Sequence, residues 1–419
     1  MHSLRLEPRR DWDLTIPVPN AFLPTNAIVL LKQHAGNPAR CAVKEGDEVR
    51  EGMVLGVPDG DFSAYVHSPI PGKVRSITTV RLPGGGECEA VEILLHGSFD
   101  RLGKRPERYI WKGMRRLDIL QAIKAKGVVE TTGRGFPLDR LLGGSEPGCD
   151  IVIPALDPEP YIRTETAIFA SRTAQVLEAA RIVQTLTEAG RIRVLIEATR
   201  QQGQEEIEAL AAPSESSAIE LTRIALSQAY TIGLASGHEG SKKKGSPIRL
   251  APSLLVAIYD AVIEARAFVE RYVTVAGGAI RRPSVLKARI GTPIGDLIEE
   301  CGGFLEAPER LVLGGPLTGL PARDLDMPVT KTLGGILALT PPETRRAKVR
   351  PCIRCGLCRE HCPVGIDPEA IMRDLLGGRP GAAHAKGLDS CVSCGICSYV
   401  CPSRLELSQT FAAHSGAPR

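Results

Sequence analysis

Short apolar runs separated by Gly, Pro and Asp fill the first hundred residues of the chain. The clearest of these runs are 27–31, 54–56 and 91–95. Runs of this length between turn-forming residues are typical of β-strands. The pattern therefore predicts an all-β unit at the start of the chain, which we place at residues 1–112.

Segments 43–56 and 66–74 resemble the two halves of a lipoyl-like, barrel-sandwich β-barrel, with glycines at the turns between very short strands. In carrier proteins of that fold, a lysine on a tight hairpin bears biotin or lipoate. The matching hairpin here is Asp59-Gly60-Asp61 and holds no lysine. We therefore expect a structural or docking barrel. We also expect His67 to be an ordinary hairpin residue, because no second histidine stands near it in the sequence.

The apolar spacing becomes helical at 117–123 and returns to buried strands at 150–153 and 193–198. Between these strands the spacing predicts one long amphipathic helix that Thr164 caps and Gly190 ends. A strand, a crossover helix and a second strand form a parallel α/β layer. We assign residues 113–262 to this unit.

A hairpin, a helix and a further strand follow in the third part of the chain. Residues 272–280 and 285–293 read as the hairpin, 294–298 as the start of the helix, and 309–316 as the next strand. This order predicts a small β-grasp domain at residues 263–345. The whole chain is then expected to be a multidomain α/β and α+β protein.

Two cysteine runs with the same spacing mark the last unit, residues 346–419. Each run reads Cys-x-x-Cys-x-x-Cys-x-x-x-Cys-Pro, the spacing that holds two 4Fe-4S clusters, with the fourth cysteine of each run bound to the other cluster. The crossing predicts one cluster on Cys352, Cys355, Cys358 and Cys401, and a second on Cys391, Cys394, Cys397 and Cys362.

A helix between the two runs is expected to cover a cluster. Asp367 is placed to cap this helix, with Pro368 in its first turn. Its predicted apolar face consists of Ile371, Met372, Leu375 and Leu376.

Structural zinc and a disulfide framework are the alternatives to clusters. A zinc site needs only four ligands in two pairs, whereas each run here supplies four cysteines at the same offsets. No secretory signal pattern opens the sequence, so nothing indicates an oxidising compartment. The remaining cysteines lack ligand spacing and are expected to be ordinary buried thiols: Cys41, Cys88, Cys149 and Cys301.

Composition limits the classes of partner. A net charge of +4 and the absence of a basic stripe interleaved with aromatic residues argue against nucleic acid, and Lys242–Lys244 are expected to be a solvated loop. No apolar run approaches the length of a membrane span. We expect a chain without its own transmembrane segment, which can contact a membrane only through partners.

The order of these parts resembles the C subunit of Rnf-type electron transport complexes, which is related to the flavin- and NADH-binding subunit of respiratory complex I. The resemblance covers nearly the whole chain. Outside the cysteine runs it is sharpest at 33–39, 66–69, 290–293, 314–316, 328–331 and 335–339. It implies a cytoplasmic protein, peripheral on the cytoplasmic face of the inner membrane, with redox subunits as partners, among them a membrane-embedded electron-transfer complex. It also implies a soluble ligand-binding β-grasp (SLBB) domain and an α/β domain in which NADH reduces FMN.

The sequence departs from this family at the positions expected to bind FMN and NADH. The glycine-rich phosphate loop appears here as 129–138, where Glu130, Thr131 and Thr132 add a charge and β-carbons that oppose anion binding. The acidic flavin segment keeps Glu159 and Tyr161, but Pro154 replaces its asparagine. A third segment, 230–236, lacks both charged residues of the family pattern.

The residues that would still contact FMN or NADH, if the site is retained, are Gly133, Arg134, Gly135, Glu159 and Tyr161. Three departures in one expected pocket favour an iron-sulfur relay that has lost or weakened its flavin site. The alternatives are an NADH:acceptor oxidoreductase with unusual FMN contacts, and a β-grasp ligand-binding module that carries clusters.

Overall fold

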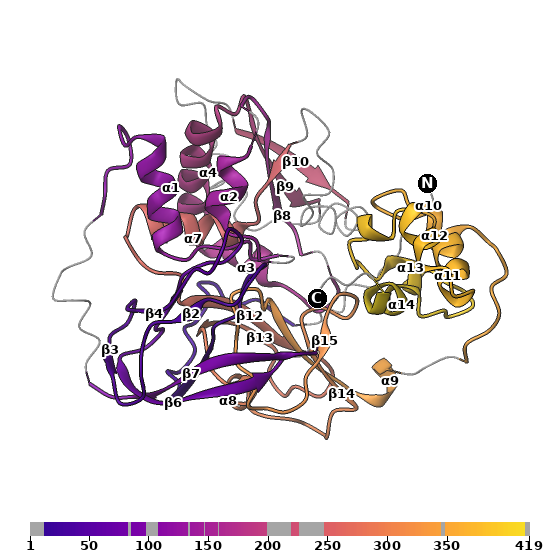
Figure 1. Ribbon diagram of the computed structural model, residues 1–419, viewed down its shortest axis with the longest axis horizontal. Helices are drawn as coiled ribbons and strands as arrows, with labels where there is room; N and C mark the ends of the chain where they lie inside the picture. Colours follow the sequence, from indigo (N-terminus) through magenta and orange to yellow (C-terminus); the bar gives the residue numbers. More distant parts are fainter. Residues whose placement is uncertain are drawn as a thin grey trace.

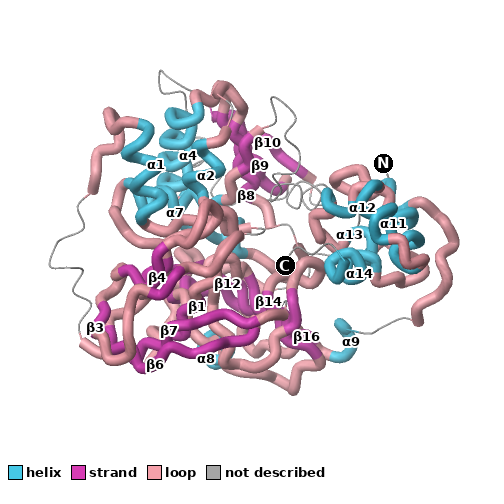
Figure 2. The backbone as a smooth tube through the Cα atoms, viewed as in Figure 1, coloured by secondary structure: helices cyan, strands magenta, loops and turns pink. Residues whose placement is uncertain are grey.

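The structure is a computed structural model that describes residues 12–82, 85–97, 108–132, 135–145, 147–157, 159–198, 219–225, 247–344 and 348–414. Four units follow one another along the chain, and they are grouped as a body with a side lobe (Figures 1 and 2). The N-terminal barrel and the third unit, a mixed sheet, lie side by side at the bottom of the view. The second unit, a parallel sheet with helices, lies above them, and the cysteine-rich fourth unit lies at the right.

The N-terminal unit consists of two small sheets that enclose one apolar core. One sheet has the order β1-β7-β6-β3 and the other β2-β4-β5. Their strands are β1 (Asn26–Leu30), β2 (Arg40–Cys41), β3 (Glu48–Val49), β4 (Val54–Val57), β5 (Val66–His67), β6 (Gly72–Arg81) and β7 (Glu87–Leu95). The strands predicted at 27–31, 54–56 and 91–95 are confirmed. Leu31, Leu55 and Ile93 are fully buried between the sheets.

The second unit is a four-stranded parallel sheet of order β10-β9-β8-β11 with helices packed on it. This arrangement confirms the predicted parallel layer. The strands are β8 (Ile151–Ala155), β9 (Ile192–Glu197), β10 (Ile219–Ile224) and β11 (Ile248–Arg249). The helices are α1 (Arg116–Ala125), α2 (Leu138–Gly143), α3 (Thr164–Ser171), α4 (Thr173–Thr187) and α7 (Pro252–Val262).

The prediction of one long helix from Thr164 to Gly190 is wrong in its details. The helix breaks at Arg172, whose backbone is not helical, so α3 and α4 are separate. At the break, the Arg172 guanidinium pairs with Asp260 of α7 at 2.9 Å. Thr164 is not the cap, because its hydroxyl contacts Thr274 and the Gly334 carbonyl. Asp157 instead accepts hydrogen bonds from the first-turn amides.

The third unit is a five-stranded mixed sheet of order β13-β12-β16-β14-β15. Its elements are β12 (Glu270–Ala276), β13 (Ser284–Arg289), α8 (Ile294–Glu300), β14 (Arg310–Leu313), β15 (Leu320–Pro321) and β16 (Gly335–Leu339). The predicted hairpin is confirmed as β12 and β13, which pair antiparallel. The central strands β12 and β16 run parallel. The short helix α9 (Pro341–Thr344) follows.

The cysteine-rich unit is helical. Its helices are α10 (Leu357–Glu360), α11 (Pro368–Leu376), α12 (Pro380–Ala385), α13 (Ile396–Tyr399) and α14 (Leu407–His414), with a 3-10 turn at Leu388–Ser390. Asp367 caps α11 as predicted by accepting from the Ala370 amide at 3.2 Å. Ile371 and Leu375 are buried, but Leu376 is 75% exposed, so the predicted apolar face is wrong at this residue. One residue beyond Leu375, a helix turns by about 100° and leaves the buried stripe.

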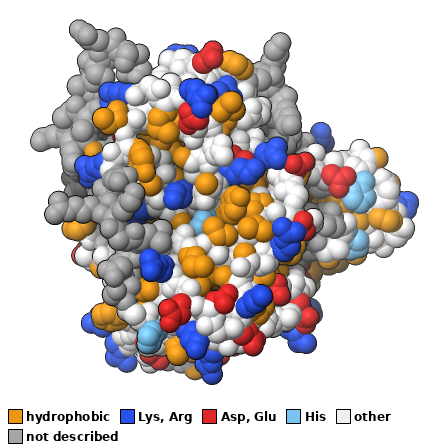
Figure 3. Space-filling model, turned by 60° about the vertical axis from the view of Figure 1, so that its left-hand side comes forward, with side chains coloured by type: hydrophobic (Ala, Val, Ile, Leu, Met, Phe, Trp, Pro, Cys, Tyr) orange, Lys and Arg blue, Asp and Glu red, His pale blue; other side chains and the backbone are white. Residues whose placement is uncertain are grey.

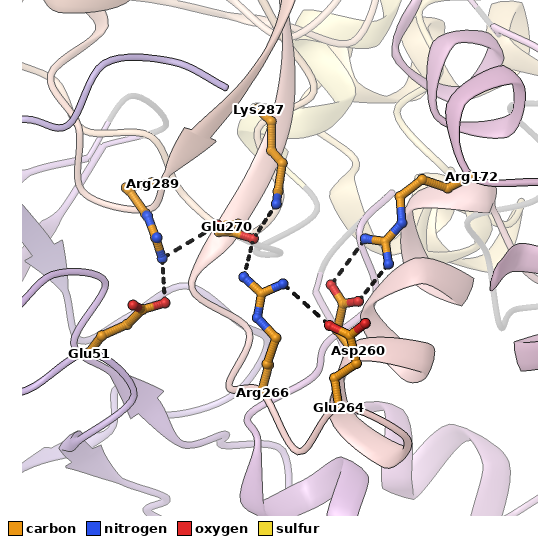
Figure 4. Close-up of polar contacts among 8 residues, drawn as sticks. All are labelled: Glu51, Arg172, Asp260, Glu264, Arg266, Glu270, Lys287 and Arg289. Atoms are coloured by element: carbon orange, nitrogen blue, oxygen red, sulfur yellow. Dashed lines mark hydrogen bonds and ion pairs between the residues drawn. The ribbon is translucent and has the colours of Figure 1, made fainter. Parts of the chain in front are cut away.

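A chain of ion pairs connects the barrel to the third unit (Figure 4). Arg289 of β13 contacts Glu51 of the barrel at 2.6 Å and Glu270 at 3.4 Å. Glu270 also binds Lys287 at 2.7 Å and Arg266 at 2.8 Å. These cations hold the pKa of Glu270 below its usual range, although burial opposes them. Such partly buried networks favour one relative placement of the units, because removal of a member leaves a charge without its partner.

Candidate functional site

Four cysteines from both runs line one apolar pocket in the helical lobe. They are Cys362, Cys391, Cys394 and Cys397, which we call the inner cysteines. The rest of the wall includes Pro363, Ile366, Ile396 and Phe411. Cys362 comes from the first run and the other three from the second, so the fold brings together the set that the crossed spacing predicts. An apolar enclosure with four thiols fits a 4Fe-4S cluster.

The inner thiols need a compensating positive charge to ionise. Burial, together with the neighbouring Cys391 and Cys362, raises the pKa of Cys394 to about 11. Burial, together with Cys394 and Cys391, raises the pKa of Cys397 to about 12. Thiolates become favourable in this setting only when a cation such as iron binds them.

The other four cysteines include the two most exposed ones of the lobe and are called the outer cysteines: Cys352, Cys355, Cys358 and Cys401. Cys352 and Cys355 are exposed, and Cys358 and Cys401 are half-buried. The Arg350 amide donates to the Ser403 carbonyl at 2.9 Å, and the Ser403 hydroxyl donates to the Pro351 carbonyl at 2.8 Å. These bonds hold the start of the first run against the end of the second, as the crossed assignment requires.

The two runs share one backbone conformation. Arg354 and Ser393, each two residues after the first cysteine of its run, have φ values of 53° and 51°. Gly356 and Gly395 have φ values of 79° and 74°, and a short helix follows each of them. Among the described residues, no three His, Cys, Asp or Glu side chains converge tightly enough to hold a single metal ion.

The loop between β14 and β15 links the inner cysteines to the rest of the molecule. Leu317 in this loop packs against Cys394 and Ile396. On its other side, the Leu317 amide donates to the Glu159 carboxylate at 2.7 Å. The Glu159 segment and the inner cysteines are therefore separated by a single loop.

The carboxylate of Glu159 accepts its hydrogen bonds from the loop between β14 and β15. Besides Leu317, the amide and the hydroxyl of Thr318 both donate to its carboxylate. A β-carbon on Gly315 would lie 2.2 Å from the carboxyl carbon of Glu159, so a side chain there would displace this carboxylate. Burial raises the pKa of Glu159, while the three donors oppose the rise.

Tyr161 also contacts the mixed-sheet unit. Its hydroxyl donates to Glu343 of α9 at 2.8 Å, and its φ of 67° is unusual for a residue with a side chain. Glu343 in turn accepts from the Gly278 and Thr340 amides. Two of the residues predicted to contact FMN thus connect two units of the protein.

The segment that replaces the glycine-rich phosphate loop is hydrogen-bonded to buried residues of other segments. The Thr131 hydroxyl bonds Ser253 at 2.7 Å, and Ser253 donates to the buried Glu165 carboxylate at 2.6 Å. The Thr131 carbonyl accepts from the buried Arg271 at 3.0 Å. Glu130 is buried as well. The residues that depart from the family pattern therefore build a polar core here.

The barrel hairpin docks beside this segment. Asp61 pairs with Arg140 of α2 at 2.6 Å, and the Phe62 ring meets the Phe136 ring edge-on at 6.0 Å. Gly135 has a φ of 72°, and a β-carbon there would crowd the Thr332 side chain at 3.0 Å and the His34 backbone at 3.2 Å. Gly133, Arg134 and the segment 230–236 lie outside the described residues, as do Lys242–Lys244.

Lys331 joins three units, a role that the sequence pattern did not predict. Its ammonium donates to the Tyr65 carbonyl of the barrel and to the Gly127 carbonyl of the parallel-sheet unit, both at 2.7 Å. The side chain is 1% exposed, and burial lowers its pKa to about 7. Family resemblance marks the segment 328–331 without giving Lys331 a function.

Two buried histidines lie near Lys331. Burial and Lys331 lower the pKa of His34 to about 4 and that of His67 to about 3. The prediction that His67 is an ordinary hairpin residue holds only in part, because its Nδ1 is buried without a hydrogen-bond partner in the part of the chain that the structure describes. Of the four cysteines outside the runs, Cys88, Cys149 and Cys301 are buried as predicted, whereas Cys41 is half-buried.

These histidines predict a loss of stability on acidification. Unfolded histidine binds a proton near pH 6.5, and the folded sites do not until about pH 4 and pH 3. The unfolded state therefore binds more protons in this window, and stability falls as pH falls. Each histidine contributes about 1.4 kcal/mol per pH unit below pH 6. Urea unfolding at pH 7.0 and 5.0 should show a smaller decrease for His67→Gln than for the wild type. An equal decrease in both proteins would contradict the account.

Family comparisons cover three of the four units. Residues 6–97 match the RnfC barrel sandwich hybrid domain, 272–321 match the SLBB domain, and 351–406 match a 4Fe-4S dicluster domain. No helix in the described part of the chain is long and apolar enough to cross a bilayer.

Several relatives share most of the chain. The C subunit of the ion-translocating oxidoreductase complex of Rhodobacter capsulatus is 30% identical over 98% of this chain and 82% of its own length. The C subunit of the proton-translocating ferredoxin:NAD(+) oxidoreductase complex of Clostridium ljungdahlii is 29% identical over 86% of this chain and 80% of its own. The C subunit of the ion-translocating oxidoreductase complex of Pseudomonas aeruginosa is 32% identical over 90% of this chain, and the match spans 50% of its length.

The domain order, the paired cysteine runs and the length of these matches lead to one assignment. The chain belongs to the family of C subunits of Rnf-type ion-translocating oxidoreductase complexes and is an iron-sulfur subunit that transfers electrons.

Proposed function

We propose that this subunit relays single electrons between protein partners through two 4Fe-4S clusters and performs no NADH or FMN chemistry of its own. The outer cysteines would hold one cluster and the inner cysteines the other. The four units would be a barrel at 1–112, an α/β domain at 113–262, a β-grasp SLBB domain at 263–345 and a two-cluster domain at 346–419.

The observation that carries this proposal is the engagement of Glu159. Its carboxylate receives three hydrogen bonds from the loop that also contacts Cys394. A carboxylate satisfied in this way has little capacity left for a ribose or flavin. Thr131 is similarly committed to Ser253, and a flavin phosphate would have to approach a segment that contains the buried Glu130. The residues present at these positions do not fit FMN.

The two sets of cysteines differ in exposure, and this difference suggests a route. Each bound cluster would carry one electron at a time, and the cysteine thiolates would hold the cluster in place. The outer set opens to solvent, where a partner protein can approach. In the inner set Cys394 and Cys397 are buried, and Leu317 packs against Cys394. The chain's own residues therefore define one exposed end and one enclosed end of the relay.

The partners would be other redox subunits, as the names of the relatives suggest, including a membrane-embedded electron-transfer complex. Such a chain would lie in the cytoplasm, peripheral on the inner membrane. No nucleic acid is expected as a partner, in keeping with the modest net charge.

An NADH:acceptor oxidoreductase that uses FMN is the second candidate. The observation in its favour is the short path from Glu159 through Leu317 to the inner cysteines. The third candidate, a β-grasp ligand-binding module, has the SLBB match in its favour. Eight cysteines at cluster spacing favour electron transfer over it.

Flavin content separates the first two candidates. Acid release from the anaerobically purified chain should give much less than one FMN per chain, and added FMN should keep its free fluorescence at micromolar concentrations. Retention of about one FMN per chain through gel filtration would restore the oxidoreductase.

A further inference from the structure

Exposed basic side chains lie close to the outer cysteines. Lys348, Arg350 and Arg354 are exposed on the first run, and Arg404, also exposed, is brought beside them by the bonds between Ser403 and residues 350–351. Two apolar side chains stand among them, since Ile353 is 67% exposed and Val349 is 55% exposed. The lobe that carries this surface projects from the body (Figures 1 and 3).

The second run provides an internal control for these charges. Counted from its cysteines, the positions equivalent to Lys348, Arg350, Arg354, Arg359 and Arg404 are Gly387, Asp389, Ser393, Ser398 and Gly365. Each of these five basic residues near the outer cysteines therefore has a non-basic residue at the equivalent position of the other run. Both runs hold the same number of cysteines, so compensation of cluster charge does not account for the difference.

Backbone conformation does not require these residues either. Arg354 and Ser393 adopt the same left-handed conformation, which a serine fills equally well. Among the ion pairs of the described residues, none involves Lys348, Arg350, Arg354 or Arg404. Arg359 reaches Asp367 at 3.7 Å. The exposed acids close to this surface in sequence are Glu360 and Glu406, so positive charge predominates.

We propose that the surface formed by Lys348, Val349, Arg350, Ile353, Arg354 and Arg404, the outer-cluster face, docks an acidic one-electron carrier protein. One electron passes between the carrier and the outer cluster, so that one is oxidised as the other is reduced, and no bond or proton moves. Opposite charge around a small apolar centre gives fast, salt-dependent encounter and a weak complex, as electron-transfer partners require.

A protein partner fits this face better than a membrane surface. The cations surround the exposed Cys352 and Cys355, and electron exchange needs a redox centre to come close there. Anionic lipid would bind the same charges but accept no electron. This inference rests on the proposed relay and names its partner class, and it does not depend on whether the chain also binds FMN.

The test is stopped-flow electron transfer from a reduced acidic 2Fe-2S ferredoxin to the oxidised, cluster-loaded chain. At low salt, Arg350→Glu/Arg354→Glu should slow the second-order rate by about tenfold or more, because steering of this kind is worth roughly 10-fold to 1,000-fold. The difference should shrink toward high salt. The matched control Lys44→Glu makes a charge reversal on an exposed barrel residue and should change the rate little.

A neighbouring charge also changes cluster potential, so each variant needs an EPR redox titration. A rate change caused by potential alone would persist at high salt and would overturn the docking assignment. Equal rates and equal salt dependence in all three proteins would overturn it as well. Loss of sedimentation with phosphatidylglycerol vesicles in the double variant, at an unchanged ferredoxin rate, would assign the face to a membrane.

Discussion

Cys362→Ser is expected to remove the inner cluster and leave the outer one. Cys362 belongs to the first run by sequence, but it lines the pocket with Cys391, Cys394 and Cys397. Iron should fall from about eight to about four per chain, since each cluster contains four. The EPR signal that remains should be that of the cluster near the solvent-exposed Cys352 and Cys355.

Cys41→Ser is the matched control, because Cys41 is half-buried and lies outside both runs. It should keep all the iron. A Cys362→Ser protein that lost the cluster bound by Cys352 and Cys355, and kept the one bound by Cys391 and Cys394, would show that the runs do not cross.

The same substitution should also loosen the lobe. Two of the inner cysteines, Cys391 and Cys397, lie against a core of few residues that includes Ile371, Leu388 and Phe411. In so small a unit, metal binding supplies a large part of the folding free energy. Proteolysis of Cys362→Ser should therefore cut first within residues 346–419 and leave the body intact.

Lys331→Ala is expected to cost about 3 to 5 kcal/mol of folding free energy, the second large effect. The substitution leaves the Tyr65 and Gly127 carbonyls buried without their donor and opens a cavity between three units. Lys44→Ala, at an exposed site, should change stability by less than about 0.5 kcal/mol.

Urea unfolding of both variants measures these values. A cost below about 1 kcal/mol for Lys331→Ala would mean that the buried amine is not needed to hold the units together. Lys331→Met separates the two contributions, since it nearly fills the space but donates no hydrogen bond.

The sequence predicted most of what depends on local pattern. The strands at 27–31, the hairpin of β12 and β13 and the capping of α11 by Asp367 follow from periodicity and capping chemistry, which act within a few residues. The cysteine spacing identified the candidate ligands for the same reason. The break at Arg172 was missed because the side chain that pairs with it there, Asp260, lies 88 residues away.

The contacts of Glu159 and Lys331 could not be predicted from local sequence. Glu159 has donors at Leu317 and Thr318, more than 150 residues further along the chain, and Lys331 has acceptors in two other units. Such contacts exist only after the units have packed. The family resemblance includes the segments that contain Glu159 and Lys331. In this chain both side chains form hydrogen bonds between different units.

Reduction by NADH tests the relay most directly. The anaerobically purified chain, with about eight iron and eight sulfide, should show no bleaching of its cluster absorbance with excess NADH, and prompt bleaching when dithionite is added to the same sample. Rapid bleaching by NADH, together with one bound FMN per chain, would contradict the relay and show that the protein oxidises NADH itself.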